Sequence, residues 1–260
     1  MSYYTALEAA KQRGGLRLVT TRGIPGPWGE AAKSIMHVKN IPVVHVAQDG
    51  GQENADLAAW TGVNNAPVAI WENERPRTGW AEILMLAERL APEPSLIPRN
   101  EAQRALMFGL AHELCGEDGY GWNRRLMFFE GWKALMQTEA GTLGRESFER
   151  MRAKYDPGTA IVHVRQRLID ILSMLRAQLE KQKSLGSRYY IGNQLSAVDI
   201  YSAAFAAMVR PLPLAQCPTT PEMHAGYHEQ DPDILAAAGA ALLDHRDYVY
   251  NTYLELPMRF

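Results

Sequence analysis

The sequence predicts a small α/β domain at residues 1–90, followed by an all-helical domain at residues 98–260. The first part alternates short apolar runs with a helical pattern, as expected of a strand, a helix and a parallel strand. Residues 91–97 are rich in proline, which is typical of a linker between domains. Beyond the linker, apolar residues recur almost entirely at helical spacing. The predicted fold class is therefore α/β followed by all-α.

Apolar spacing predicts the elements of the first domain in chain order. They are a strand at 16–20, a helix at 28–39, a strand at 42–46, a short helix around 56–60, a β-hairpin built from 66–71 and 75–78, and a helix at 81–90. Since the first strand, helix and second strand lie within about thirty residues, we expect a right-handed unit with parallel strands. Pro76 removes a backbone donor, so the second hairpin arm is predicted to be an edge strand.

Three helices of the second domain are clearly indicated. Residues 161–179 place leucine, isoleucine and valine at helical spacing, which predicts a long amphipathic helix that stops near Gly186. The segment Ser196-Ala197-Val198-Asp199 has the form of a capping box at the start of a buried helix. In that motif the serine hydroxyl accepts from the N–H of Asp199, and the carboxylate accepts from the N–H of Ser196. A last helix is expected at 233–254.

Composition narrows the possible function classes. The chain has 260 residues, a net charge of −2 and 47% hydrophobic residues, which is ordinary for a globular protein and argues against a dedicated nucleic-acid binder. No apolar run is long enough to span a membrane, and the first residues lack the pattern of a secretory signal. Cys115 and Cys217 do not suggest a disulfide framework. We expect a cytoplasmic protein with no nucleic-acid or membrane partner.

Three local motifs resemble the glutathione transferase superfamily. Asn65-Ala66-Pro67-Val68 matches the family's turn before the third strand, in which the proline is cis. The segment 190–200, which contains the capping box, closely matches a buried helix of the family, and 83–90 resembles the helix after its acidic-Ser glutathione motif. The resemblance covers nearly the whole chain. It implies a thioredoxin-like N-terminal domain, a helical C-terminal domain and a ligand cleft between them.

The resemblance implies glutathione as co-substrate, held near Pro25, Trp28 and the backbone of Ala66 and Pro67. The family's catalytic serine or cysteine directly before the first proline of the helix is replaced here by Gly26, so the thiolate lacks its usual hydrogen-bond donor. The candidate substitutes are the hydroxyls of Thr20 and Thr21, the guanidinium of Arg22, the indole N–H of Trp28, and backbone N–H groups at the start of the helix. Of these, Thr21 and Arg22 are our catalytic candidates.

A second departure concerns the γ-glutamyl end of glutathione. The family's acidic-Ser pair falls on Gly79 and Trp80, and Thr78, one residue away, can supply a hydroxyl. A helix beginning here would still offer free N–H groups to the γ-glutamyl carboxylate, so we expect residues 78–80 to hold it. Helical geometry predicts that Glu82 is aimed away from Gly79.

Residues 116–125 interrupt the helical pattern with three glycines and two large aromatic residues. In the family, the corresponding early helices contribute the pocket for the acceptor substrate. Tyr120, Trp122 and Arg125 are therefore candidate acceptor-pocket residues. The alternative interpretation is a capped bend whose aromatic side chains pack into the core.

His224 and His228 are four residues apart, a spacing that metal sites use on helices. Gly226 and the preceding prolines make a stable helix unfavourable, so a loop with incidental histidines is predicted. We expect no metal.

The favoured function is a transferase that joins the thiolate of glutathione to a small, mostly apolar electrophile, because the usual role of the fold is catalytic. The alternative is a non-catalytic scaffold that binds another small ligand or a protein partner, as the replacement of the catalytic residue by Gly26 suggests. The resemblance also implies a homodimer in which residues 71–80 of one subunit meet 106–115 of the other across a two-fold axis.

Overall fold

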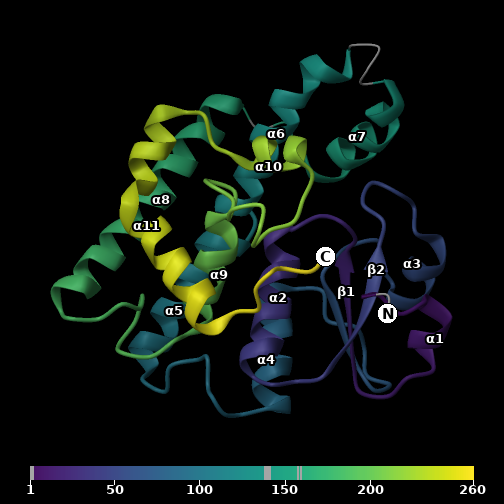
Figure 1. Ribbon diagram of the computed structural model, residues 1–260, viewed down its shortest axis with the longest axis horizontal. Coiled ribbons are helices and arrows are strands. Elements are labelled where there is room, and N and C mark those ends of the chain that lie inside the picture. Colours follow the sequence, from purple (N-terminus) through teal and green to yellow (C-terminus); the bar gives the residue numbers. More distant parts are fainter. Residues whose placement is uncertain (1–2, 138–141, 157, 159) are drawn as a thin grey trace.

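The computed structural model describes residues 3–137, 142–156, 158 and 160–260. Its N-terminal part contains α1 (Leu7–Lys11), β1 (Leu16–Thr21), α2 (Pro27–Val38), β2 (Val43–Gln48), α3 (Ala55–Thr61), β3 (Val68–Trp71) and α4 (Trp80–Leu90). The helical part contains α5 (Glu101–Cys115), α6 (Tyr120–Met136), α7 (Thr142–Tyr155), α8 (Ile161–Ser184), α9 (Ala197–Ala206), α10 (Pro221–Tyr227) and α11 (Pro232–Tyr253). Figure 1 shows α2 and α4 between the sheet and the helical part.

The sheet has the strand order β2–β1–β3. Strands β1 and β2 are parallel, with Leu16 opposite Val43, and β3 runs antiparallel to β1. The predicted strand–helix–strand unit is thus confirmed. The predicted second arm of the hairpin is wrong as a strand, because it forms only one bridge, between Ala69 and Arg77. Pro76, which has no N–H to donate, directly precedes that bridge.

One continuous apolar core joins the two parts of the chain. Leu18 and Ile35 of the N-terminal part lie in the same buried cluster as Leu172 and Val198 of the helical part. A smaller cluster on the other face of the sheet contains Val19, which follows from the alternation of side chains along β1. The two parts are therefore held against each other by packed apolar side chains, with α2 lying directly on α9.

The predicted start of α9 is confirmed at Ser196, and α8 ends near Gly186 as expected. The carboxylate of the fully buried Asp199 accepts the Ser196 N–H at 2.8 Å, as the capping box requires. The same carboxylate accepts from the Ser196 hydroxyl, the N–H of Tyr190 and Nε2 of His245. The buried Asp199 carboxylate thus holds together three parts of the chain: the start of α9, the segment at Tyr190 that precedes α9, and α11.

The loop prediction for His224 and His228 is wrong. His224 lies in the short helix α10, and His228 is the residue that caps its carboxyl end. Thr220 caps this helix by accepting from the N–H of Met223, and Pro221 occupies its first turn, where a proline is compatible with a helix. Among the described residues, no group of three or more His, Cys, Asp or Glu side chains is arranged to hold a metal ion.

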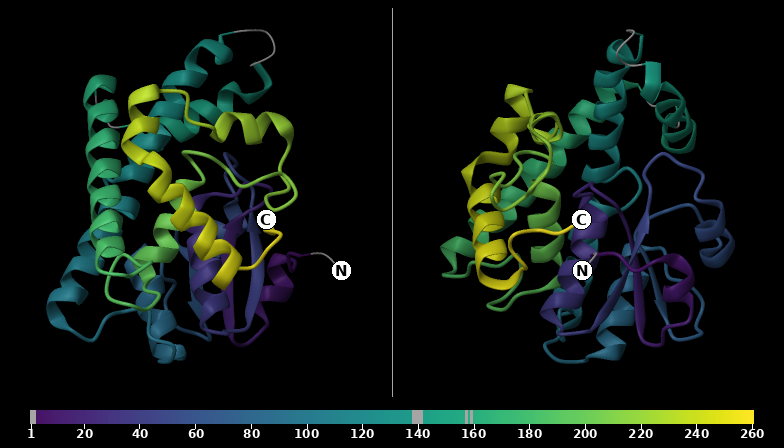
Figure 2. Two further views of the ribbon diagram at one scale, coloured as in Figure 1. Left: turned by 60° about the vertical axis from the view of Figure 1, so that its left-hand side comes forward. Right: turned by 45° about the vertical axis from the view of Figure 1, so that its right-hand side comes forward.

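The last residues lie close to the first described ones, since the Arg259 guanidinium lies over the ring of Tyr3 at 6.0 Å. After α11 the last residues run back across α2, as Figure 2 shows, and Lys33 of α2 donates a hydrogen bond to the carbonyl of Arg259. Within the part of the chain that the structure describes, no helix has both the length and the apolar character needed to cross a bilayer.

His45 on β2 makes folding stability depend on pH. Its ring stacks on Tyr3 at 4.4 Å, and burial lowers the pKa of His45 from 6.5 to about 4, with Lys33 and Arg259 adding to the effect. Between these values the unfolded chain binds a proton that the folded chain does not, so stability is lost as the pH falls from 6.5 towards 4. After allowance for partial exposure, we expect His45 to account for about 1–2 kcal/mol of this loss.

The measurement is urea unfolding between neutral and mildly acidic pH. His45→Gln should flatten the pH dependence in this window, whereas the same change at the exposed His163 should leave it as in the wild type. An unchanged slope in His45→Gln would show that other groups cause the acid sensitivity.

Candidate functional site

A cavity of about 330 Å³ opens between the two parts of the chain at the amino end of α2. We call it the interdomain cavity. Its floor comes from the N-terminal part, at Thr20, Thr21, Ile24, 26–30, Gln48, 50–53, Asn64 and Ala66. Its walls come from the helical part, at Gly121, Arg125, Phe128, Phe129, Trp132, Arg150, Met151, Lys154, Tyr155, Met208 and Tyr227. In Figure 1 the helices α6, α7 and α10 lie above the sheet on this side.

The amino end of α2 is open to a ligand. Gly26 precedes the helix in an extended conformation, and among the described residues no side chain caps it. Pro27 has no N–H, and the N–H of Glu30 already donates to the Gly26 carbonyl at 2.9 Å. The N–H groups of Trp28 and Gly29 are left without an intrahelical partner, at the positive end of the helix dipole. This end of α2 therefore favours an anion in the cavity.

The hydroxyl of Thr21 lies on the cavity floor and donates to Oε1 of Gln48 at 3.0 Å. Thr20 also lines the floor, with its hydroxyl 3.3 Å from that of Tyr4. Arg22 lies outside the cavity: its side chain is exposed, pairs with Asp49 at 3.1 Å and lies over the ring of Tyr4. Of our two catalytic candidates, only Thr21 therefore faces the space where a ligand would sit.

Trp28 and Arg125 meet across the cavity. The indole N–H of Trp28 donates to the carbonyl of Cys115 at 2.9 Å, so it is not available to a ligand. The Arg125 guanidinium lies over the ring of Trp28 at 4.6 Å and over that of Tyr155 at 4.1 Å. Burial lowers the pKa of Arg125, yet an arginine keeps its charge in proteins. The structure thus brings a cation and two rings together where the floor of the cavity meets its helical wall.

Of the other residues expected to contact glutathione, some line the cavity and others do not. Ala66 lines the cavity, whereas Pro25 and Pro67 are buried outside its lining. The peptide bond between Ala66 and Pro67 is cis, as predicted. Residues 78–80 do not line the cavity, and Trp80 packs edge-on against Tyr201.

The prediction for Glu82 is wrong. Its carboxylate turns back and accepts from the N–H groups of Thr78 and Gly79 at 3.4 and 3.3 Å, while Arg75 pairs with it at 2.8 Å. The pKa of Glu82 is lowered by the bond from Arg75 and by these N–H donors. Gly79 and Glu82 have the spacing of a capping box, with a glycine in place of the usual serine or threonine. The two N–H groups are therefore already occupied by a carboxylate of the chain itself.

The three residues predicted for the acceptor pocket also lie in different places. The break in the helical pattern is confined to residues 116–119, and α6 begins at Tyr120. Tyr120 is buried in the core, Trp122 packs edge-on against Tyr155, and only Arg125 lines the cavity. Cys115 is buried too, which raises the pKa of its thiol well above the usual value.

Sequence reasoning missed the contribution of α7. The Gly51 carbonyl accepts from the Ser147 hydroxyl at 3.2 Å and from two nitrogens of Arg150 at 3.1 and 2.9 Å. Lys154 donates to the carbonyl of Asn64 at 2.6 Å. Helix α7 is thereby tied to two of the loops that contribute to the cavity floor, those of Gly51 and Asn64. These contacts join residues about ninety positions apart, so no local pattern indicates them.

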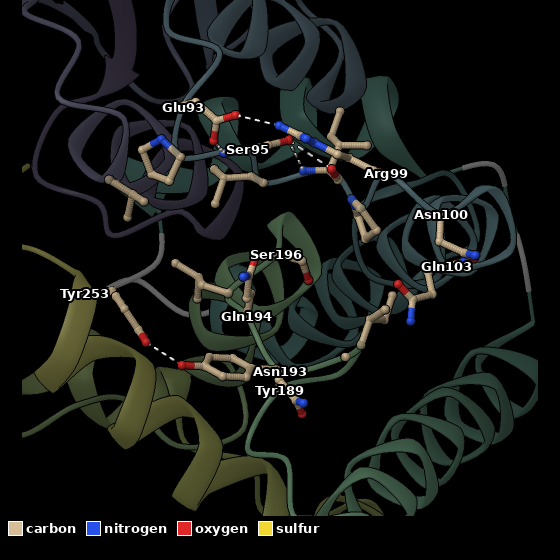
Figure 3. Close-up of a pocket in the computed structure, with 18 of the residues that line it drawn as sticks. Glu93, Ser95, Arg99, Asn100, Gln103, Tyr189, Asn193, Gln194, Ser196 and Tyr253 are labelled. Atoms are coloured by element: carbon tan, nitrogen blue, oxygen red, sulfur yellow. Dashed lines mark hydrogen bonds and ion pairs between the residues drawn. The ribbon is translucent and has the colours of Figure 1, made fainter.

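A second cavity of about 1150 Å³ lies at the carboxyl end of α2, between the 93–100 segment and the 189–196 loop. Figure 3 shows its main polar pairs. Glu93 pairs with Arg99 at 2.9 Å, and the hydroxyls of Tyr189 and Tyr253 lie 2.5 Å apart. Because these groups satisfy one another, they do not converge on a ligand. The interdomain cavity is therefore the better candidate site, although it is smaller.

We compared the sequence and the structure of this chain with those of known proteins. The sequence matches no protein-family model and no curated protein. Its structure is similar to β-etherase LigF from Sphingobium sp. strain SYK-6, with a TM-score of 0.62, 18% identity, and coverage of 91% of this chain and 95% of that one. It is also similar to a glutathione S-transferase from Methylobacterium radiotolerans in complex with glutathione sulfonate. The TM-score is 0.59 and the sequence identity 15%, with 91% of each chain covered.

A rice glutathione transferase in complex with glutathione gives a TM-score of 0.56 at 16% identity, covering 95% of this chain and 94% of that one. These similarities extend over both parts of the chain. The protein has the glutathione transferase fold, with a thioredoxin-like N-terminal domain followed by the helical C-terminal domain.

Proposed function

We propose that this protein binds glutathione in the interdomain cavity and joins its sulfur to a small, mostly apolar electrophile. One observation carries the proposal: the open amino end of α2, with the N–H groups of Trp28 and Gly29, lines a cavity walled by aromatic side chains. Two structures of similar fold hold glutathione or glutathione sulfonate, which supports the choice of ligand.

In the proposed reaction the thiol first loses its proton to solvent, and the N–H groups of Trp28 and Gly29 stabilise the thiolate. The sulfur then attacks an electrophilic carbon. A bond between sulfur and carbon forms, and the leaving group departs with the electron pair of the bond that breaks. Thr21 lines the cavity floor, and its hydroxyl can act as a second donor only by turning its proton from Gln48 to the sulfur. Arg22 is left out, since it pairs with Asp49 outside the cavity.

The peptide part of glutathione is proposed to lie along Ala66, next to Gln48 and Asn64, which also line the floor. Its γ-glutamyl carboxylate would extend to the N–H groups of Thr78 and Gly79. Since Glu82 already occupies those groups, binding has to displace it, and glutathione should bind weakly.

Removal of the Glu82 carboxylate tests this arrangement. In Glu82→Ala the N–H groups of Thr78 and Gly79 are released, so we expect glutathione to bind about three- to tenfold more tightly, as for an anion gained at a helix amino end. Thermal-shift titration measures it, because a ligand that prefers the folded state raises the melting temperature. Glu101→Ala, a change at another first-turn glutamate, is the matched control.

Two results would contradict the proposal. If millimolar glutathione raises the melting temperature of neither the wild type nor Glu82→Ala, glutathione is not the ligand. If glutathione binds both variants equally, its γ-glutamyl end lies elsewhere.

The second candidate function is a scaffold that binds a small ligand or a protein partner without catalysis. It is favoured by Gly26, which brings no side chain to the amino end of α2. The two candidates differ in one measurable property, since a scaffold binds its ligand without accelerating conjugation of the thiol.

We also propose that the protein is a homodimer and that it is located in the cytoplasm. Leu106, in the expected segment 106–115, and Met85, on the helix that follows segment 71–80, are large apolar side chains that remain 42% and 45% exposed. Both cysteines are free, as is usual in a reducing compartment.

A further inference from the structure

Among the described residues, the Arg125 guanidinium has aromatic neighbours and no hydrogen-bond acceptor. It lies over the rings of Trp28, Tyr155 and Trp122 at 4.6, 4.1 and 5.6 Å. Within the described part of the chain, no hydrogen bond or ion pair engages its five N–H donors. Stacking of this kind uses the face of the planar group and leaves the donors at its edge free. Since Arg125 lines the interdomain cavity, those donors are available to a ligand there.

The other charged side chains around the cavity are already engaged or exposed. Glu30 pairs with Lys33 at 2.7 Å, Lys154 donates to the Asn64 carbonyl, and Arg150 is held by Gly51 and Glu146. Glu53 lies on the exposed loop before α3. Arg125 is therefore the charge in the inner wall that still lacks a counter-ion among the described residues.

The space beside Arg125 suits an aromatic or alkyl body. Phe128 and Trp132 of α6 line it, with their rings stacked at 6.0 Å, and Met151 of α7 lines it too. A partly buried guanidinium recognises a carboxylate best, because two parallel N–H donors match its two oxygens. A ligand that satisfies this wall combines an apolar ring or chain with one carboxylate.

We infer that the acceptor substrate is an apolar electrophile that carries a carboxylate, and that Arg125 is the residue that selects it. This inference rests on the proposed function, because it names the substrate class of that reaction. It narrows the class from apolar electrophiles in general to organic acids. In the reaction the carboxylate is only bound; the bond changes at the electrophilic carbon are those given above.

The test compares S-benzylglutathione with three S-(carboxybenzyl)glutathiones. Each of these carries one added carboxylate on the ring, in the ortho, meta or para position. By isothermal titration calorimetry, at least one isomer should bind the wild type about tenfold more tightly than S-benzylglutathione. In Arg125→Gln this advantage should fall to about twofold or less, and Arg125→Lys, which keeps the charge without the planar fork, should retain part of it. Because the result is a ratio of two affinities within one variant, a general weakening by the substitution cancels.

Arg104→Gln is the matched control, since Arg104 is an exposed arginine that also lies over a ring, that of Phe108. It should keep the wild-type ratio. The inference is overturned if no isomer binds the wild type more tightly than S-benzylglutathione, or if Arg125→Gln weakens both ligands equally, which would mean that Arg125 binds glutathione itself.

Failure of the proposed function gives a different result. If S-benzylglutathione does not bind, the pair 4-methylbenzoate and 4-methylbenzamide tests the cavity without glutathione. Tighter binding of the acid that disappears in Arg125→Gln would support the carboxylate site and reject glutathione as its partner. Equal or absent binding of the pair would overturn the carboxylate site as well.

Discussion

Asp199→Ala is expected to lower the free energy of unfolding by about 3–5 kcal/mol, as when one partner of a buried charged network is removed. Asp199 is fully buried and accepts four hydrogen bonds, from Ser196 N–H, Ser196 Oγ, Tyr190 N–H and His245 Nε2, at 2.7–3.0 Å. Alanine would leave the two buried N–H groups and the ring of His245 without an acceptor, and each unmade bond adds its desolvation cost. The start of α9 would lose its cap at the same time.

Urea unfolding followed by tryptophan fluorescence measures the loss. Asp170→Ala on the exposed face of α8 is the control and should change stability by about 0.5 kcal/mol or less. A loss below about 1 kcal/mol in Asp199→Ala would contradict the assigned network, since it would mean that water or a neighbour replaces the carboxylate.

The parts of the fold that depend on neighbouring residues were predictable. The start of α9 follows from Ser196 and Asp199, whose contact spans one helical turn. The parallel β1–β2 pair follows from the strand–helix–strand order. The second hairpin arm was not predicted correctly, because Pro76 leaves it a single bridge. The helix α10 was missed because the cap at Thr220 outweighs the low helix propensity of Gly226.

The candidate site was predictable mainly on its N-terminal side, and Arg125 is the one predicted pocket residue of the helical part that lines the cavity. The start of α2 and the turn at Ala66 follow from local motifs, and both line the cavity. The opposite wall requires contacts between distant residues, such as Arg125 with Tyr155 or Arg150 with the Gly51 carbonyl. Glu82 departs from the prediction for a different reason: ideal helical geometry aims its side chain away from Gly79, whereas the extended backbone of Gly79 lets the carboxylate fold back.

The second large effect is expected from Gly26→Ser, which should turn weak or absent conjugation into measurable catalysis. Gly26 has φ −64° and ψ 127°, an ordinary conformation for serine, and a Cβ there meets no atom within 4 Å. A serine here brings a hydroxyl whose proton is free to donate, while the N–H groups of Trp28 and Gly29 stay available to the same sulfur. That donor would lie at the open end of α2, on the cavity floor. One added donor should lower the thiol pKa of bound glutathione by about one unit and raise the conjugation rate about tenfold or more.

Ultraviolet absorbance of the bound thiolate and the rate with 4-nitrobenzyl chloride measure the two effects separately. Gly131→Ser is the matched control, because Gly131 lies on the exposed side of α6 and a Cβ there also meets nothing within 4 Å. If Gly26→Ser binds glutathione as the wild type does but gains neither thiolate absorbance nor rate, the sulfur does not lie at the amino end of α2. The proposed catalysis would then fail, and the scaffold would be the better account of a cavity that has lost its catalytic side chain.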